Sequence, residues 1–293
     1  IDDPSAYFQT TLYTGNGGTQ TITNGGNSDL KPDWLWLKKR NASVNHFLFD
    51  SVRAVSKEIN TNNTEAEASP SNYLASFDSD GFSIGSDSDI NGNNDTLVAW
   101  QWKAGTSFTN DASSTGIGSI DSSGSVNQDA GFSIVKWVAN GSNATIKHGL
   151  STAPSMIILK TTSVQKNWVV GHDGIGWGKN LWLNGGDAVN TGSTYWNNTA
   201  PTNSVFSVGT AGDTNDSGET IIAYCFADVK GYSKVSGSYV GNGNVSGTFC
   251  YCGFKPAFIL QKNTARAGSG WGMFDATRTP TNVSKGMLIA NST

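Results

Sequence analysis

A histidine beside a carboxylate is the arrangement in this sequence that comes nearest to catalytic chemistry. The chain has three histidines, and His172 is followed directly by Asp173. A carboxylate can orient an imidazole as a general base, but the base must then activate a nucleophile. No Gly-x-Ser-x-Gly elbow stands beside this pair, and no cysteine has a matching context. We therefore expect that the protein is not an enzyme, and we assign no catalytic residues.

Two carboxylates, Asp78 and Asp80, are the candidate pair for glycoside hydrolysis, a reaction that uses paired acids. Gly81 and Phe82 follow them directly. A glycine between an acidic turn and an aromatic residue is more typical of a chain entering a strand. We favour the turn.

An acidic stretch resembles the first half of a calcium loop. Asp87, Asp89, Asn91 and Asp95 are the candidate ligands, with a glycine after Asn91. The twelfth position is Val98, where an EF-hand needs a bidentate glutamate. We therefore favour an acidic Asn-Gly hairpin turn and expect no metal and no cofactor.

Tryptophans are the remaining candidates for ligand binding. An exposed indole beside asparagine offers a sugar ring a flat apolar face and polar partners. Trp177 and Trp196 lie among glycine and asparagine and are the candidate exposed pair, whereas packing in a core is the more common role of tryptophan. We favour core packing for the tryptophans as a group and keep Trp177 and Trp196 as candidate glycan contacts.

The elements that must position these residues recur along the chain. Three segments share a proline, a short apolar strand and a lysine, beginning at Pro32, Pro154 and Pro256. In the first two segments, Phe82 and Phe206 are each followed 18 residues later by an aromatic alternation that begins at Trp100 and Tyr224. Matched spacing of this kind predicts an internal repeat.

Each repeat also carries an apolar stretch that closes on an aspartate. We expect the repeated lysine and aspartate to form a structural ion pair that ties two neighbouring strands together, with a ligand-binding charge pair as the alternative. The expected pairs are Lys38 with Asp50, Lys160 with Asp173, and Lys262 with Asp275.

The composition predicts the fold class and excludes some partners. Charged residues make up only 14%, against about 25% in typical globular domains. Their place is taken by Gly, Ser, Asn and Thr, which favour turns and exposed strand faces. The net charge of −4 does not favour nucleic acid, and no apolar run reaches the roughly 20 residues of a membrane span. We expect an all-β protein of tandem β-sandwiches.

The predicted domains follow the repeat. The expected boundaries are 1–105 for sandwich copy 1, 106–129 for a Ser/Gly-rich linker or arm, 130–236 for copy 2, and 237–293 for a partial copy 3.

Several motifs together resemble a repeated tail-fibre-like domain of marine tailed-phage virion structural proteins. The matching stretches include Asp3-Pro-Ser-Ala-Tyr-Phe8, Phe49-Asp-Ser-Val-Arg53, Ser76-Phe-Asp-Ser-Asp-Gly-Phe82 and Ala99-Trp-Gln-Trp-Lys-Ala-Gly105. The resemblance implies a jelly-roll or concanavalin-like sandwich and brings no catalytic residues with it.

From this resemblance we expect a structural protein of the virion, in a tail fibre or another surface appendage, that attaches to a host surface glycan. Other virion proteins and further copies of the chain are the expected partners, with a trimer if it forms a fibre. A capsid-decorating protein without a receptor and a carbohydrate-active enzyme or its lectin module are the alternatives.

Overall fold

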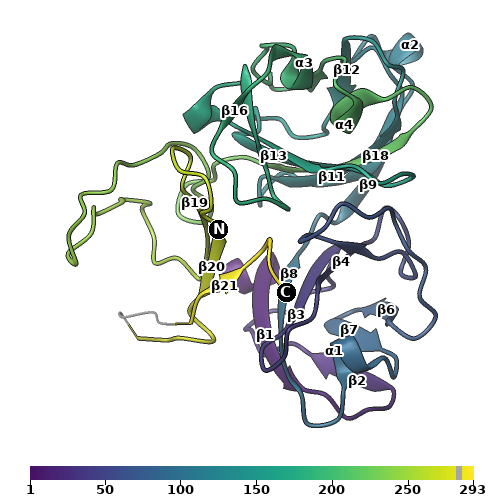
Figure 1. Cartoon of the computed structure of the whole chain (residues 1–293). Coiled ribbons are helices and arrows are strands. Elements are labelled where there is room, and N and C mark those ends of the chain that lie inside the picture. The colour runs from purple at the N-terminus through teal and green to yellow at the C-terminus, as the bar shows by residue number, and fades with distance from the viewer. Residues whose placement is uncertain (282–285) are drawn as a thin grey trace.

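The computed structural model describes residues 1–281 and 286–293, and its regular structure is almost entirely antiparallel β-strand. Two β-sandwiches and a smaller third sheet lie around a common centre (Figure 1). The predicted all-β class is confirmed. Within the described part of the chain, no helix is both long and apolar enough to cross a membrane.

The first sandwich packs a sheet of five strands against a sheet of three. The larger sheet has the order β1 (Phe8–Thr14), β8 (Thr96–Trp102), β3 (Trp34–Lys39), β4 (His46–Asp50), β5 (Ile59–Asn60), and the smaller has β2 (Gln20–Thr23), β7 (Gly81–Ile84), β6 (Leu74–Asp78). Every residue of β3 and β4 is buried. Strands buried on both faces need apolar residues at consecutive positions, which Trp34-Leu-Trp-Leu37 supplies.

The second sandwich has a larger main sheet of the same antiparallel kind. Its order is β16 (Asn190–Thr191), β15 (Lys179–Trp182), β14 (Trp168–His172), β13 (Met156–Thr161), β18 (Thr220–Phe226), β11 (Phe132–Val138), β10 (Ser122–Asn127), β9 (Thr106–Asn110), and the covering sheet is β12 (Ala144–Lys147) with β17 (Val205–Val208).

The predicted linker 106–129 is wrong, because β9 and β10 form two strands at one edge of the second sandwich. Serine and threonine suit an edge strand that faces water. Gly124 lets the Phe108 ring lie against the strand, since a Cβ at this glycine would come within 2.9 Å of that ring. The Ser/Gly-rich composition therefore indicated a polar hairpin that folds as part of the sheet.

Helical turns occur only as short connections among the described residues. They are η1 (Pro4–Ala6), α1 (Ser88–Asn91), α2 (Ala112–Thr115), η2 (Asp173–Ile175), α3 (Ser193–Trp196) and α4 (Gly212–Asn215).

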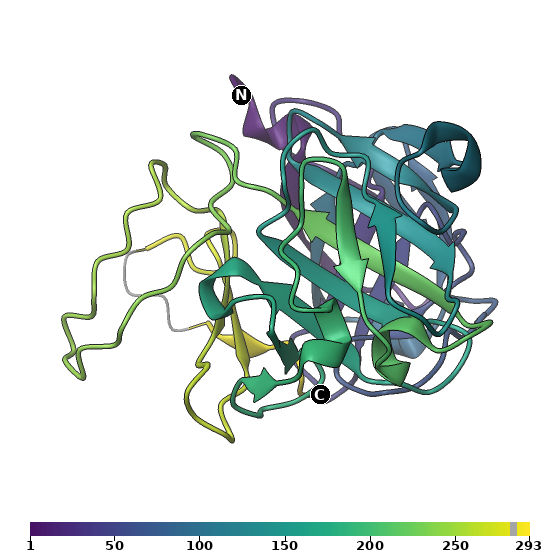
Figure 2. The ribbon, with the colours of Figure 1, turned by 90° about the horizontal axis from the view of Figure 1, so that it is seen from above.

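The third sheet is smaller and follows a long segment without regular structure. Its strands are β19 (Phe258–Lys262), β20 (Trp271–Asp275) and β21 (Leu288–Ile289), in that order. The preceding segment, 237–257, stands away from the sandwiches (Figure 2).

Strand pairing places residues of the two sandwiches at corresponding positions. Trp100 of β8 lies opposite Trp36 of β3, and Tyr224 of β18 lies opposite Ile158 of β13. Phe82 and Phe206 each lie in the smaller sheet of their sandwich, on β7 and β17.

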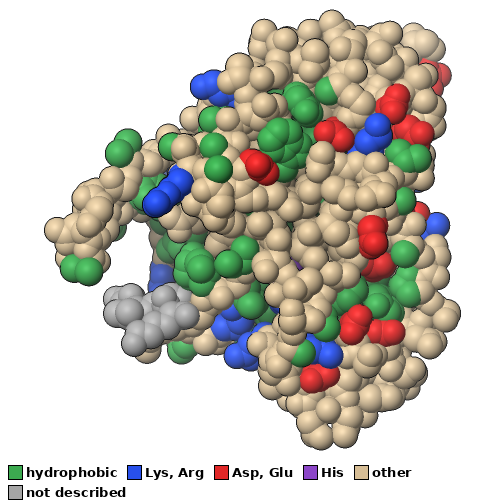
Figure 3. All heavy atoms as spheres, in the orientation of Figure 1, with side chains coloured by type: hydrophobic (Ala, Val, Ile, Leu, Met, Phe, Trp, Pro, Cys, Tyr) green, Lys and Arg blue, Asp and Glu red, His purple; other side chains and the backbone are tan. Residues whose placement is uncertain are grey.

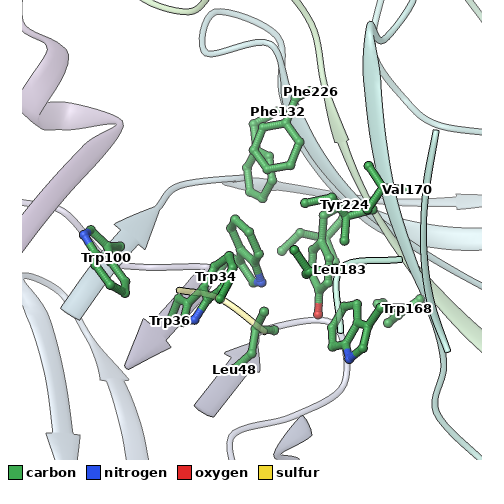
Figure 4. Close-up of a cluster of buried hydrophobic side chains, with 14 of the residues drawn as sticks. Trp34, Trp36, Leu48, Trp100, Phe132, Trp168, Val170, Leu183, Tyr224 and Phe226 are labelled. Carbon is green, nitrogen blue, oxygen red and sulfur yellow. The ribbon is translucent and has the colours of Figure 1, made fainter. Parts of the chain in front are cut away.

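Three buried cores hold these layers together. One lies inside each sandwich, and a third, which we call the central core, joins both sandwiches to the third sheet. Figure 4 shows part of the central core, where Trp34, Phe132 and Tyr224 approach one another. The central core includes Trp34, Trp36 and Trp100 from the first sandwich, Phe132, Trp168 and Tyr224 from the second, and Trp271 and Met273 from the third sheet.

Candidate functional site

The central core is built from aromatic side chains that cross between the sandwiches. The rings of Trp34 and Tyr224 are stacked, with centroids 4.7 Å apart and planes inclined by 27°. Both side chains are buried. An aromatic pair of this kind contributes about 0.5–1.5 kcal/mol beyond the area that it buries.

A buried carboxylate at the edge of this core is fully paired. Asp50 accepts hydrogen bonds from the Tyr224 hydroxyl at 2.7 Å, from the Arg53 guanidinium, and from the backbone N–H groups of Val52 and Arg53. Burial alone would lower the pKa of Arg53, but the negative charges of Asp50 and Glu67 and the hydrogen bond to Asp50 raise it above its ordinary value. This cluster fastens the second sandwich to the first.

The third sheet repeats the arrangement. Asp275 accepts from the indole N–H of Trp100 at 3.0 Å and from the backbone N–H of Arg278 at 2.7 Å, and it also pairs with the Arg278 guanidinium. The Arg278 guanidinium in turn donates to the Gly286 carbonyl. The first sandwich is thereby fastened to the third sheet.

A second set of contacts runs around the same centre. The indole N–H of Trp168 donates to the Asn60 carbonyl at 2.8 Å, which links the second sandwich to the first. The indole N–H of Trp271 donates to the Trp182 carbonyl at 2.8 Å, which links the third sheet to the second sandwich.

His46 is the residue of the first sandwich that corresponds to Trp168, but its Nε2 is buried and has no hydrogen-bond partner within the described residues. Its Nδ1 accepts from the Trp36 indole at 2.9 Å, so the neutral ring carries its hydrogen on Nε2. Burial lowers the pKa of His46 to about 3, while the Ile289 carbonyl acts in the opposite direction. The ring is therefore neutral near pH 7 and lies beside the third sheet.

The predicted lysine–aspartate pairs are wrong. In each antiparallel hairpin the aspartate lies at the far end from the lysine: Lys38 is opposite His46, whereas Asp50 is opposite Trp34. The carboxylates of Asp50 and Asp275 instead pair with an arginine three residues later. Asp173 lies just beyond its strand, where its carboxylate accepts from the backbone N–H of Gly237 at 3.1 Å.

The three lysines hold backbone carbonyls. Lys38 donates to the carbonyl of Val44 at 2.8 Å, and Lys160 donates to that of Thr161 at 2.7 Å. Lys262 donates to the Ser269 carbonyl at 2.6 Å. Burial lowers the pKa of Lys38 and of Lys160 to about 8, and it also lowers the pKa of Lys262.

The tryptophans proposed as glycan contacts are buried. Trp177 is 8% exposed and Trp196 is fully buried, and their rings meet edge to face with centroids 5.4 Å apart. Gly171 makes the room, because a Cβ there would lie 2.5 Å from the Trp177 ring and 2.7 Å from that of Trp196. The prediction that they are exposed is therefore wrong, and they fill the interior of the second sandwich.

Three of the four candidate calcium ligands, Asp87, Asn91 and Asp95, are already engaged within the protein, and Asp89 lies in the first turn of α1. Asp87 caps α1, and Asp95 pairs with Lys39 at 2.8 Å. Asn91 is buried and donates to the Gly85 carbonyl at 2.8 Å. Within residues 1–281 and 286–293, no cluster of acidic, histidine or cysteine residues is arranged to hold a metal ion. The expected hairpin turn is also wrong, because α1 is a helical turn.

The residues considered for catalysis do not assemble into a catalytic set. Both ring nitrogens of His172 face backbone groups, the Val235 carbonyl at 2.8 Å and the N–H of Gly174 at 2.9 Å. Ser83, which does lie in a Gly-x-Ser-x-Gly sequence, is part of strand β7 and donates to Asp78 at 2.7 Å. Ser83 is therefore not on the strand-to-helix turn that a nucleophile elbow requires.

A polar recess of about 380 Å³ lies where the two sandwiches meet. This volume lies within the range of small-molecule sites. Within the described residues, no carboxylate forms an ion pair with Lys136. The recess is lined by residues that include Arg53, Lys57 and Glu67 from the first sandwich and Lys136, Thr162 and Ser163 from the second.

These observations define an all-β protein whose two sandwiches and third sheet are fastened around one core. Over residues 3–293 the chain matches the family described as a domain of unknown function (DUF7483), and it belongs to that family. No curated protein and no solved structure matches the chain.

Proposed function

We propose that this protein is a structural component of a phage virion, part of a tail fibre or another surface appendage, that attaches to glycans of the host surface. The observation that supports this role most is the central core. Contacts such as that of Tyr224 with Asp50 and that of Trp100 with Asp275 make two sandwiches and a third sheet resist displacement together. A virion appendage needs this kind of rigidity, because it transmits force while it presents a binding surface.

The polar recess between the sandwiches is the proposed place of attachment. Sugar hydroxyls and carboxylates bind well to hydroxyl and cationic side chains, and Lys136 and Ser163 supply both kinds of group. One such site binds weakly, and several copies of the chain in one oligomer raise avidity by roughly 10²–10⁴. A homo-oligomer, a trimer in a fibre, fits this requirement.

Binding of the oligomer to host cells and to purified surface glycans tests this proposal. Lys136→Ala should weaken binding about tenfold or more, by analogy with the loss of one charge-assisted hydrogen bond. Lys179→Ala, which removes an exposed lysine outside the recess, is the matched control and should bind like the parent chain.

Other outcomes would overturn the proposal in different ways. Cleavage of the glycan would contradict the non-enzymatic role. Absence of binding, with the protein lying on the capsid lattice, would favour the decoration role. Light scattering of the purified protein decides whether the expected oligomer forms.

A further inference from the structure

The recess between the two sandwiches has walls that are fixed to one another. The backbone N–H of Glu67 donates to the Thr162 carbonyl at 2.8 Å, and that of Lys166 donates to the Thr64 carbonyl at 2.9 Å. These bonds hold a loop of the first sandwich along a loop of the second. A ligand in the recess therefore meets groups from both sandwiches in a preformed arrangement, which lowers the cost of binding.

One cation of the recess has no partner of opposite charge. Arg53 pairs with Asp50 and, at 3.1 Å, with Glu67. Lys57 also pairs with Glu67, at 2.9 Å, so two carboxylates balance these two cations. Lys136 forms no ion pair with any described residue. The recess therefore has one ammonium group available to a ligand.

Lysines elsewhere in the protein show the usual alternative. Lys39 pairs with Asp95 at 2.8 Å, and Lys166 pairs with Asp216 at 3.1 Å. On the face shown in Figure 3, several Lys and Arg side chains likewise lie beside Asp or Glu side chains. Lys136 is half-buried and has no such neighbour in the described part of the chain, so its charge is balanced only by the solvent or by a ligand.

The repeat shows that the fold does not need a lysine at this position. Lys136 lies two residues after Ile134 of the central core, on the same face of strand β11, which is directed at the first sandwich. The two sandwiches have corresponding rows of opposite residues, Lys136–Ile222–Lys160 and Leu12–Val98–Lys38. The first sandwich thus folds with a leucine where the second has this lysine. We therefore look for the role of Lys136 in binding.

The other polar groups of the recess limit the kind of anion that fits. Glu67 lines the recess, and Glu219 accepts from the hydroxyl of Ser163, which is also part of the lining. A group with two negative charges, such as a phosphomonoester, is repelled by these carboxylates. Sugar hydroxyls can instead donate to Glu67 and bind the hydroxyl of Thr220, another lining residue.

We propose that the recess binds a sugar residue that bears one carboxylate, as uronic acids do. The sugar carboxylate pairs with Lys136, and the ring hydroxyls bind Glu67 and Thr220. This assignment rests on the proposed glycan attachment and adds a charge requirement to it. A neutral sugar leaves Lys136 unpaired, and a phosphorylated sugar brings more negative charge than the recess accepts.

The probe is a panel of bacterial surface polysaccharides, each immobilised as isolated and again after its carboxyl groups have been reduced to alcohols. The reduction turns each acidic sugar into its neutral counterpart. The full chain should bind acidic polysaccharides, and reduction should weaken this binding about tenfold or more, because the charged hydrogen bond to Lys136 is lost. Added salt should weaken binding to the unreduced forms more than to the reduced forms.

Lys136→Leu supplies the matched variant, because it places the leucine of the first sandwich in the recess. This variant should bind the two forms of each polysaccharide equally weakly. Lys179→Leu, which changes an exposed lysine outside the recess, should keep the full difference between the forms. A guanidinium unfolding midpoint close to that of the parent chain shows that each variant is folded.

Three results would overturn the acidic sugar. They are equal binding of the two forms by the parent chain, an unchanged difference in Lys136→Leu, and equally strong binding of phosphorylated polysaccharides. Each of them would leave glycan attachment itself standing, with a different sugar or a different site. A parent chain that binds no polysaccharide of the panel would instead overturn the attachment, and with it the assignment that rests on it.

Discussion

Removing one hydroxyl between the sandwiches should weaken the whole fold. Tyr224→Phe keeps the ring that stacks on Trp34 and leaves no cavity, but it removes the hydrogen bond to Asp50. A hydrogen bond to a charged group contributes about 1.5–3 kcal/mol. Asp50 keeps its bonds to Arg53 and to two backbone N–H groups, so the loss is that of this one bond. We expect the free energy of unfolding to fall by about 1.5–3 kcal/mol.

The assay is guanidinium unfolding followed by tryptophan fluorescence, and Tyr195→Phe is the control. Tyr195 is partly buried, and its hydroxyl has no hydrogen-bond partner among the described residues, so the control should change stability by less than about 0.5 kcal/mol. Asp50→Asn should cost about 3–5 kcal/mol, because the buried Arg53 loses its main counter-charge. The double variant Tyr224→Phe/Asp50→Asn should lose less free energy of unfolding than the two single variants lose together. Additive losses, or a Tyr224→Phe protein as stable as the parent, would refute the link between the sandwiches.

Two further predictions concern burial. Lys160 has a folded-state pKa of about 8, below its ordinary 10.5, so between these values the unfolded chain binds more protons and the free energy of unfolding should rise with pH. Denaturation at pH 8 and pH 9.5 should show this rise, and Lys160→Met should reduce it but not abolish it, because the pKa of Lys38 is also lowered to about 8; equal slopes for the parent and the variant would contradict the assignment. Gly171→Ala should destabilise the protein by about 1–3 kcal/mol, because the added methyl meets the rings of Trp177 and Trp196. The comparison variant is Ala227→Gly, a small change in the same core, because Gly176 has a φ of +80° and an alanine there would be strained for another reason. The stability of both variants is measured by calorimetry. A Gly171→Ala protein with unchanged stability would refute the packing argument.

The sequence predicted the strands better than the contacts between them. Alternation and the repeated proline–strand–lysine pattern place β3, β13 and β19 correctly, because both depend on neighbouring residues. The ion pairs depend on which residue lies opposite which, and equal spacing along a hairpin does not give that register. A usable signal was present in Asp50-Ser-Val-Arg53 and Asp275-Ala-Thr-Arg278, where the arginine lies three residues after the aspartate.

The candidate binding residues were harder to predict. The burial of Trp177 and Trp196 depends on Gly171, and a glycine in the sequence does not indicate that two rings pack against it. The recess depends on residues from two sandwiches far apart in sequence, such as Glu67 and Lys136. No local sequence pattern predicts that residues so far apart in the chain line one recess.

The most direct test of the proposed virion role is immunogold electron microscopy of virus particles purified from cultures that produce this chain. Antibodies against the protein should label a fibre or another appendage that projects from the particle. Labelling of the capsid lattice, or particles that carry no label at all, would contradict the account.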